Sequence, residues 1–156
     1  MTERGVGGHR DLPDTVDTEG LGRELAADLR AGDLVILDGP LGAGKTAFTR
    51  GVGAGLGVTG RVSSPTFIIA RQHAPGVAGR PGLIHVDAYR LADANGNATL
   101  DDLDALDLDT DLADSVVVVE WGEGVAERLT DEHLLVRLRR DDESETRHAV
   151  WEWVST

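Results

Sequence analysis

The stretch Gly39-Pro-Leu-Gly-Ala-Gly-Lys-Thr46 matches the pattern G-x-x-x-x-G-K-[ST], the phosphate-binding loop, or P-loop. An apolar run, Leu34–Asp38, precedes the loop, and the residues from Ala47 onward can continue as a helix. Glycines let the backbone turn several N–H groups toward phosphate oxygens, and the N-terminus of the helix presents its positive end to the same anion. The motif therefore predicts a nucleotide-phosphate site between a buried strand and a helix.

The individual positions of the loop have expected roles. We expect Lys45 to place a full positive charge on the outer phosphates, and the hydroxyl of Thr46 to ligate Mg²⁺. Lys45 is the only lysine of the chain, which excludes GTPases that read guanine with an N-K-x-D or T-K-x-D motif. The residues expected to surround the nucleotide phosphates are Leu41, Gly42, Ala43, Gly44, Lys45, Thr46 and Ala47.

Composition limits the class of protein. The chain has 156 residues, 40% of them hydrophobic, which suits one domain with a substantial core. Cysteine is absent, so disulfides and thiolate metal sites are excluded. The polar N-terminus and the lack of a membrane-length apolar run predict a cytoplasmic protein without a membrane partner. The net charge of −13 argues against general electrostatic binding of nucleic acid, because phosphates would be repelled.

Apolar periodicity predicts helices and strands mixed along the chain, the α/β class, with antiparallel strands at its C-terminal end. Residues 1–14 are expected to be a flexible tail that ends in a short edge strand at most, and residues 15–156 to be a single domain. A helix is expected over residues 15–31, capped by Asp17 or Thr18. A second helix follows the P-loop to about Gly55.

The remaining segments are assigned from their apolar patterns. β-branched or apolar runs predict strands over residues 67–70, 83–89 and 115–121. Alternating patterns over residues 134–138 and 148–154 predict two antiparallel strands joined by a charged turn. The aspartate-rich residues 99–111 fit a short acidic helix and lack the glycine and terminal glutamate of an EF-hand.

Two carboxylates stand at the ends of predicted strands. Asp87 ends the run Leu83-Ile-His-Val86, and Glu120 ends the run Ser115-Val-Val-Val-Val119. In open α/β sheets, ligands bind at the carboxyl ends of the strands. A carboxylate there costs several kcal/mol to bury unless it is paired or holds a metal ion. We therefore expect Asp87 and Glu120 to be the acidic residues of the phosphate site.

Other residues are weaker candidates. Thr66, in the segment Ser63-Ser-Pro-Thr66, has a hydroxyl in a loop that proline partly presets, so it can sense the γ-phosphate or Mg²⁺. Trp121 stands beside Glu120, where it either covers the nucleotide or fills the core. His85 is interpreted as an ordinary buried histidine. The positive charge for the transition state can come from Arg50, Arg71 or Arg90, or from a partner protein.

Four signatures in order, Gly39–Thr46, Ser64-Pro-Thr-Phe67, His85-Val-Asp-Ala-Tyr-Arg-Leu91 and Val119-Glu-Trp121, together resemble the TsaE (YjeE) family. The resemblance covers about residues 15–121. This family provides the bacterial ATPase required for N6-threonylcarbamoyladenosine modification of tRNA.

The resemblance implies a fold of the P-loop NTPase type, a three-layer sandwich with a mostly parallel central sheet and antiparallel C-terminal strands. It implies that the protein binds ATP and Mg²⁺ and hydrolyses ATP weakly alone. It also implies that the protein acts together with the TsaB–TsaD pair, which transfers the threonylcarbamoyl group to the adenosine next to the anticodon. Contact of this chain with tRNA is then expected to be mostly indirect, through these partners. Carried over by motif, Lys45 contacts the β- and γ-phosphates, Thr46 and Glu120 hold the metal, Asp87 and Thr66 belong to the catalytic site, and Trp121 lies beside the nucleotide.

Two other readings of the same loop remain open. One is a small-molecule kinase, although the chain is short and has no arginine-rich lid-like segment. The other is a nucleotide-sensing module that binds ATP without hydrolysing it and changes only its affinity for a partner. Phosphate transfer to a metabolite would identify the kinase, and the absence of phosphate release with partners present would identify the sensor.

Overall fold

The structure is a computed structural model that describes residues 7–39, 44–58, 70–77, 79–87, 115–120, 132–141, 144 and 146–155, with residues 70–72 and 87 described by their backbone alone. Its elements in chain order are β1 (Gly8–Leu12), α1 (Thr15–Ala26), β2 (Leu34–Asp38), α2 (Lys45–Leu56), β3 (Ala70–His73), β4 (Gly82–Asp87), β5 (Ser115–Glu120), β6 (Glu132–Arg140) and β7 (Arg147–Ser155). Neither of these helices is long and apolar enough to cross a membrane.

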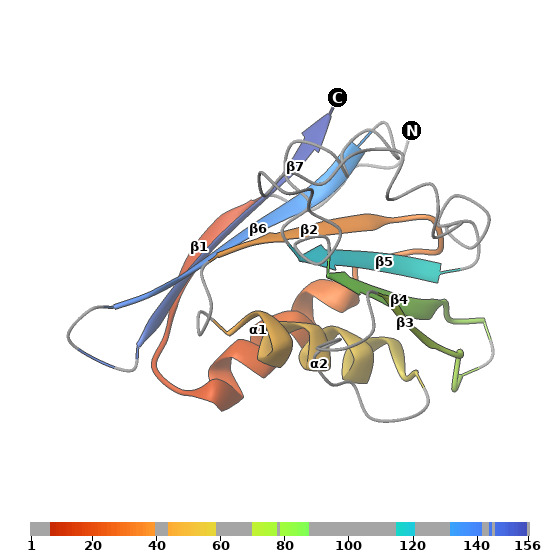
Figure 1. Cartoon of the computed structure of the whole chain (residues 1–156), viewed down its shortest axis with the longest axis horizontal. Coiled ribbons are helices and arrows are strands. Elements are labelled where there is room, and N and C mark those ends of the chain that lie inside the picture. Colours follow the sequence, from red (N-terminus) through yellow and green to blue (C-terminus); the bar gives the residue numbers. More distant parts are fainter. Residues whose placement is uncertain are drawn as a thin grey trace, which may run out of the picture.

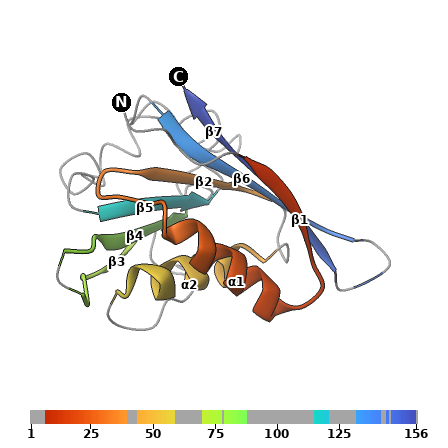
Figure 2. The ribbon, with the colours of Figure 1, turned by 180° about the vertical axis from the view of Figure 1, so that it is seen from behind.

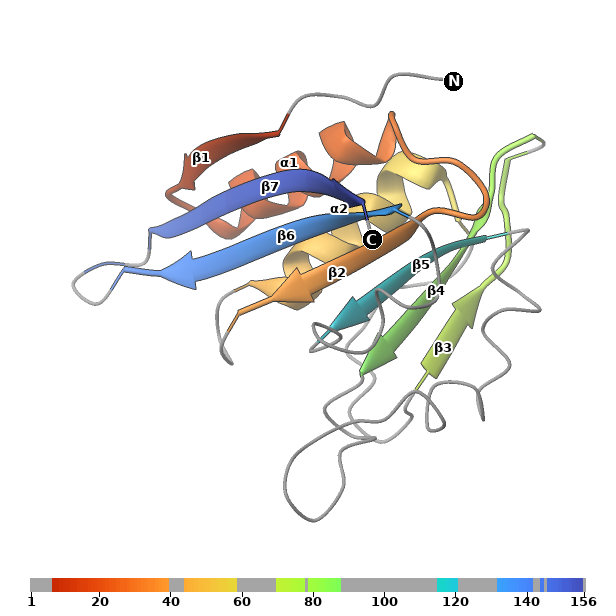
Figure 3. The same ribbon diagram turned by 90° about the horizontal axis from the view of Figure 1, so that it is seen from above.

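The strands form one seven-stranded sheet in the order β1-β7-β6-β2-β5-β4-β3, which Figure 3 shows from above. The four central strands β6, β2, β5 and β4 run parallel. β7 and β1 extend one edge in antiparallel pairing, and β3 pairs antiparallel with β4 at the other edge. The predicted P-loop-type fold, with a parallel centre and antiparallel C-terminal strands, is confirmed.

Both α1 and α2 cover the same face of the sheet (Figures 1 and 2). The main hydrophobic cluster lies between them and the sheet and includes Val35 and Val118 on the central strands. On the opposite face, Ile36 and Val117 are also fully buried. Both faces of the central strands are therefore shielded from water, as a three-layer arrangement requires.

The two helices approach each other through glycines. A Cβ atom on Gly51 of α2 would lie 1.9 Å from the carbonyl oxygen of Glu19, and one on Gly22 of α1 would lie 2.2 Å from the carbonyl oxygen of Phe48. No side chain fits at such distances, so the backbones touch directly. The glycines that weaken α2 as an isolated helix thus set the spacing of the helix pair.

We expect Gly51→Ala to lower the free energy of unfolding by at least about 2 kcal/mol, because the added methyl group forces α1 and α2 apart. Gly20→Ala is the matched control, since a Cβ at Gly20 of α1 meets no atom within 4 Å. That control should gain up to about 1 kcal/mol from helix propensity. Urea denaturation measures both. Equal stability of the two variants would contradict the backbone contact.

The N-terminal segment contains the short edge strand that the sequence allowed. Gly8–Leu12 pair with β7 at the edge of the sheet, and the side chain of Leu12 is fully buried. Arg10 forms an ion pair with Glu24 of α1, and its hydrogen bond lowers the pKa of the Glu24 carboxyl group. The Arg10 guanidinium also lies 5.8 Å from the ring centroid of Trp151. Residues 8–12 therefore belong to the sheet, and residues 1–6 of the predicted tail lie outside the described residues.

Helix α1 also begins and ends at other residues than the pattern predicted. Its N-cap is Asp14, not Asp17 or Thr18; the Asp17 carboxylate instead accepts a hydrogen bond from the Asp14 N–H at 2.9 Å. The helix ends at Ala26 rather than at residue 31. After Ala26 the backbone tightens into bonds between residues three apart, and Leu29 is still buried at 1% exposure. The apolar period continued past the helix because this turn also packs on the core.

Most predicted strands are found in place. The runs at Leu34–Asp38 and Ser115–Glu120 form β2 and β5, and β6 and β7 form the expected hairpin. β3 begins at Ala70, where the predicted strand over residues 67–70 ends. The rest of that strand and the acidic helix over residues 99–111 fall outside the part of the chain that the structure describes.

Candidate nucleotide-phosphate site

Topology brings the ends of three strands and the start of α2 to one edge of the sheet. β2, β5 and β4 are parallel neighbours, and Leu37, Glu120 and Asp87 pair in register across them. Glu120 therefore ends the strand beside the P-loop strand, and Asp87 ends the next strand along the sheet, both at its carboxyl edge. Their positions at strand ends are as expected, and their roles at the phosphates stay predictions.

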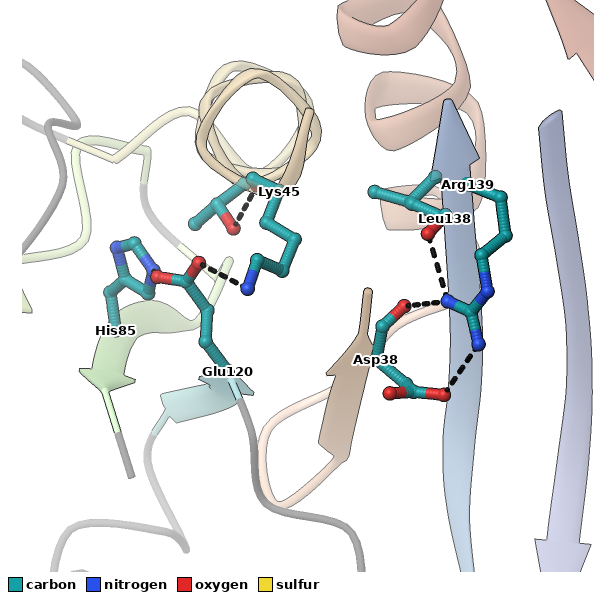
Figure 4. Close-up of polar contacts among 7 residues, drawn as sticks. Asp38, Lys45, His85, Glu120, Leu138 and Arg139 are labelled. Carbon is teal, nitrogen blue, oxygen red and sulfur yellow. Dashed lines mark hydrogen bonds and ion pairs between the residues drawn. The ribbon is translucent and has the colours of Figure 1, made fainter. Parts of the chain in front are cut away.

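Lys45 and Glu120 meet at this edge. Lys45 is the first residue of α2, and its Nζ lies 4.0 Å from Oε1 of Glu120, the last residue of β5 (Figure 4). The two residues are only 5% and 6% exposed. Such burial raises the cost of leaving a charge without its counter-charge, so the approach of these two side chains to one another is favourable. The Thr49 hydroxyl donates to the Lys45 carbonyl oxygen at 3.0 Å, one turn into the helix.

His85 belongs to the same cluster, as a buried histidine whose hydrogen-bond partner is Glu120. Its Nε2 lies 2.7 Å from Oε2 of Glu120, and its side chain is fully buried on β4 (Figure 4). His85 pairs in register with Val118, a member of the hydrophobic cluster under the helices, so it lies on the face of β4 that the helices cover. The sequence carried one signal: His85 and Asp87 are spaced by two residues on one strand.

Gly44 forms the N-cap of α2 and has the left-handed conformation, with φ of 99°. Its carbonyl oxygen accepts the N–H of Phe48 at 2.9 Å, which starts the helix. A Cβ on Gly44 would lie 2.9 Å from Cδ and 3.1 Å from Nε of Arg147, the first residue of β7. Sequence reasoning missed Arg147 because no motif connects it with the loop; only the sheet does.

The end of β2, just before the loop, is held by two arginines. Asp38 Oδ2 accepts hydrogen bonds from Arg137 and Arg139 of β6, both at 3.2 Å, and Figure 4 shows Arg139 against Asp38. Arg50, one of the expected sources of transition-state charge, instead pairs with Glu19 at 3.1 Å. These pairs are partly exposed, so each adds little stability and mainly orients the side chains.

The residues present fit a magnesium nucleotide. Thr46 and Glu120 offer hard oxygen donors, and Lys45 offers a cation at the N-terminus of α2. Among the residues that the structure describes, no three acidic or histidine side chains gather to hold a metal ion by themselves. Mg²⁺ commonly takes one or two protein oxygens and completes its shell with phosphates and water, so a sparse donor set suits it.

The other predicted site residues divide into two groups. Gly44, Lys45, Thr46 and Ala47 open α2, and their contacts with phosphate stay predictions. The remaining ones lie outside the described residues: Leu41, Gly42, Ala43, Thr66 and Trp121.

Comparison with known proteins places the chain in a family. The model of the family described as threonylcarbamoyl adenosine biosynthesis protein TsaE matches residues 12–149. A protein of Mycobacterium tuberculosis named tRNA threonylcarbamoyladenosine biosynthesis protein TsaE is 54% identical over 147 residues, which cover 94% of this chain and 88% of that protein. The protein of the same name from Streptomyces coelicolor is 57% identical over 133 residues, 83% of this chain and 86% of the relative.

The fold agrees with a solved relative. The crystal structure of Bacillus subtilis YdiB superposes with a TM-score of 0.73 and 27% sequence identity, covering 99% of this chain and 90% of YdiB. The family match spans both carboxylate-bearing strands and ends within β7, two residues after Arg147. The chain therefore belongs to the TsaE family of threonylcarbamoyl adenosine biosynthesis proteins.

Proposed function

We propose that this protein is the Mg²⁺-dependent ATPase subunit of the bacterial machinery that makes N6-threonylcarbamoyladenosine in tRNA, weakly active alone and activated by the TsaB–TsaD pair. The observation that carries the proposal is the buried approach of Lys45 to Glu120, at 4.0 Å, where the P-loop helix begins. The names of the relatives, which speak of tRNA threonylcarbamoyladenosine biosynthesis, support the pathway.

In this proposal the loop N–H groups and Lys45 hold the β- and γ-phosphates, helped by the positive end of α2. Thr46 and Glu120 would hold Mg²⁺, which would neutralise part of the phosphate charge. Asp87, in register with Glu120, orients the attacking water, and Thr66 and Trp121 contribute from the loops. TsaB–TsaD, rather than this acidic chain, holds most of the tRNA, because the net charge of −13 disfavours phosphate binding in general.

Arg147 supplies further positive charge in cis in this proposal. Its Cδ and Nε lie over Gly44, so the guanidinium reaches the region of the phosphate loop from β7. Arg50 is less suited, since its guanidinium is already paired with Glu19. Transition-state stabilisation in phosphoryl transfer depends on such fixed cations. The weak activity of the isolated chain then reflects a final activating group that the partner pair provides.

The test is nucleotide-dependent co-purification with TsaB–TsaD, followed by measurement of phosphate release from the complex. The proposal predicts slow release by the chain alone and clear stimulation by the partners. Nucleotide-dependent association without phosphate release would identify the sensing module instead. Transfer of phosphate to a metabolite in an acceptor screen would identify the kinase.

Arg147→Gln is expected to raise the KM for ATP about tenfold, since a charge-assisted contact with phosphate contributes about 1.4 kcal/mol or more. Arg140→Gln is the matched control, because Arg140 lies opposite Arg147 in the β6–β7 register. The control substitution removes the same charge from the same hairpin. Stimulated ATPase kinetics measure both variants. An equal rise in KM in both would mean that the effect is general electrostatics.

A further inference from the structure

The two carboxylate oxygens of Glu120 face different side chains. Oε2 lies 2.7 Å from His85 Nε2, whereas Oε1 lies 4.0 Å from Lys45 Nζ (Figure 4). The terminal torsion of a glutamate is soft and close to twofold, so a free carboxylate presents either oxygen in many orientations. The group that holds Oε2 therefore determines the plane of the carboxylate and leaves Oε1 to face the start of α2.

The surroundings of the two ring nitrogens of His85 indicate which of them carries the proton. Its Nδ1 is buried and has no hydrogen-bond partner in the part of the chain that the structure describes. A proton on Nδ1 would be a buried donor without an acceptor, and an unprotonated Nε2 would set its lone pair against the carboxylate at 2.7 Å. The arrangement with Nε2–H donating to Oε2 avoids both costs and leaves only a buried acceptor on Nδ1.

We propose that His85 is a positioning residue: its Nε2–H holds Oε2 of Glu120, so that Oε1 points toward the magnesium nucleotide. The role of Oε1 rests on the proposed function, whereas the hydrogen bond rests on the distances alone. His85 touches neither phosphate nor metal and acts only through Glu120. Sequence reasoning missed this role because the partner strand β5 lies far along the chain.

Loss of this hydrogen bond should weaken Mg²⁺ binding rather than nucleotide binding. Hydrogen-bond partners of metal ligands typically contribute 10- to 100-fold to metal affinity or activity. We therefore expect His85→Leu, which fills space without a donor, to raise the Mg²⁺ concentration needed for half-maximal binding of a fluorescent ADP analogue by roughly tenfold. Binding of the same analogue in EDTA should change little.

His85→Gln tests whether the donor or the shape matters, because its amide nitrogen can donate to Oε2 from a similar position. The Mg²⁺ concentration that His85→Gln needs for half-maximal binding of the ADP analogue should therefore lie close to that of the parent protein. His133→Gln is the matched control, a buried histidine on β6 that β2 separates from β5. Equal defects in the Leu and Gln variants, with melting temperatures like that of the parent, would overturn the proposal, as would normal Mg²⁺ dependence of His85→Leu.

The proton position can be observed without any nucleotide. Nitrogen-15 NMR of histidine-labelled protein distinguishes Nε2–H from Nδ1–H and from a doubly protonated ring, and the His85 signals are those missing from the His85→Gln spectrum. An Nε2–H ring is the expected result, and either other form overturns the inference. If instead the complex with TsaB–TsaD releases no phosphate, the proposed function fails, and this spectrum is unaffected.

Discussion

Lys45→Ala is expected to lower kcat/KM for partner-stimulated ATP hydrolysis by at least about 100-fold, the usual effect of removing one preorganised positive group from a developing anion. Lys45 is the only lysine of the chain, and it stands where β5 and α2 meet. Among the described residues, no arginine forms an ion pair with Glu120, so Lys45 is the positively charged side chain beside it. Phosphate release by the complex with TsaB–TsaD measures the loss.

The control for Lys45→Ala is Arg23→Gln, which removes one positive charge from the exposed part of α1. It should leave stimulated hydrolysis within about twofold, since surface charges act weakly at physiological salt. Co-purification with the partners shows that each variant still assembles. Unchanged stimulated turnover in Lys45→Ala would mean that the loop is not the hydrolytic site.

Glu120→Gln is expected to reduce stimulated kcat by about 100-fold or more, because the neutral amide is a poor ligand for a hard cation and a poor electrostatic stabiliser. The side chain keeps its size, so Mg²⁺-free nucleotide should still bind to the loop and Lys45. Two measurements are therefore needed, namely phosphate release by the complex and binding of an ADP analogue in EDTA. A parallel loss in both would assign Glu120 to nucleotide binding itself.

Stability gives Glu120→Gln a second readout. The substitution leaves Lys45, 5% exposed, without its carboxylate, and we expect the free energy of unfolding to fall by about 1–3 kcal/mol. The double variant Lys45→Ala/Glu120→Gln removes both charges. It should be more stable than the sum of the single effects predicts, because neither charge is then buried without the opposite charge of this pair.

Local patterns predicted the elements that carry the site. The apolar run before Gly39 is β2, the valine run before Glu120 is β5, and Phe48, Val52 and Leu56 are the buried face of α2. These predictions succeed because burial on a parallel sheet or under a helix requires apolar residues at a characteristic spacing in the sequence. The rule that ligands bind at the carboxyl ends of such strands then placed Glu120 beside Lys45.

Pairings between distant segments could not be predicted in the same way. Arg147 lies over Gly44 only because β7 returns beside β6, and His85 meets Glu120 only because β4 pairs with β5 in a particular register. A shift of one residue would turn His85 to the other face. The end of α1 was missed for a related reason: Leu29 is buried by tertiary packing in a turn, and its position mimics one more helical turn.

The sheet order also has a consequence for the synthesis of the chain on the ribosome. Both neighbours of the P-loop strand β2, namely β5 and β6, come from the last third of the sequence. When the loop and its helix have left the ribosome, β2 still lacks every strand that will flank it, and Glu120 has not been made. The helix pair and the β3–β4 pair, whose contacts each span a short stretch of chain, can form early. The phosphate site is therefore among the last parts of the molecule to be assembled. A chain cut short before β5 would expose the fully apolar segment Leu34–Leu37 as an unpaired edge, a state prone to aggregation.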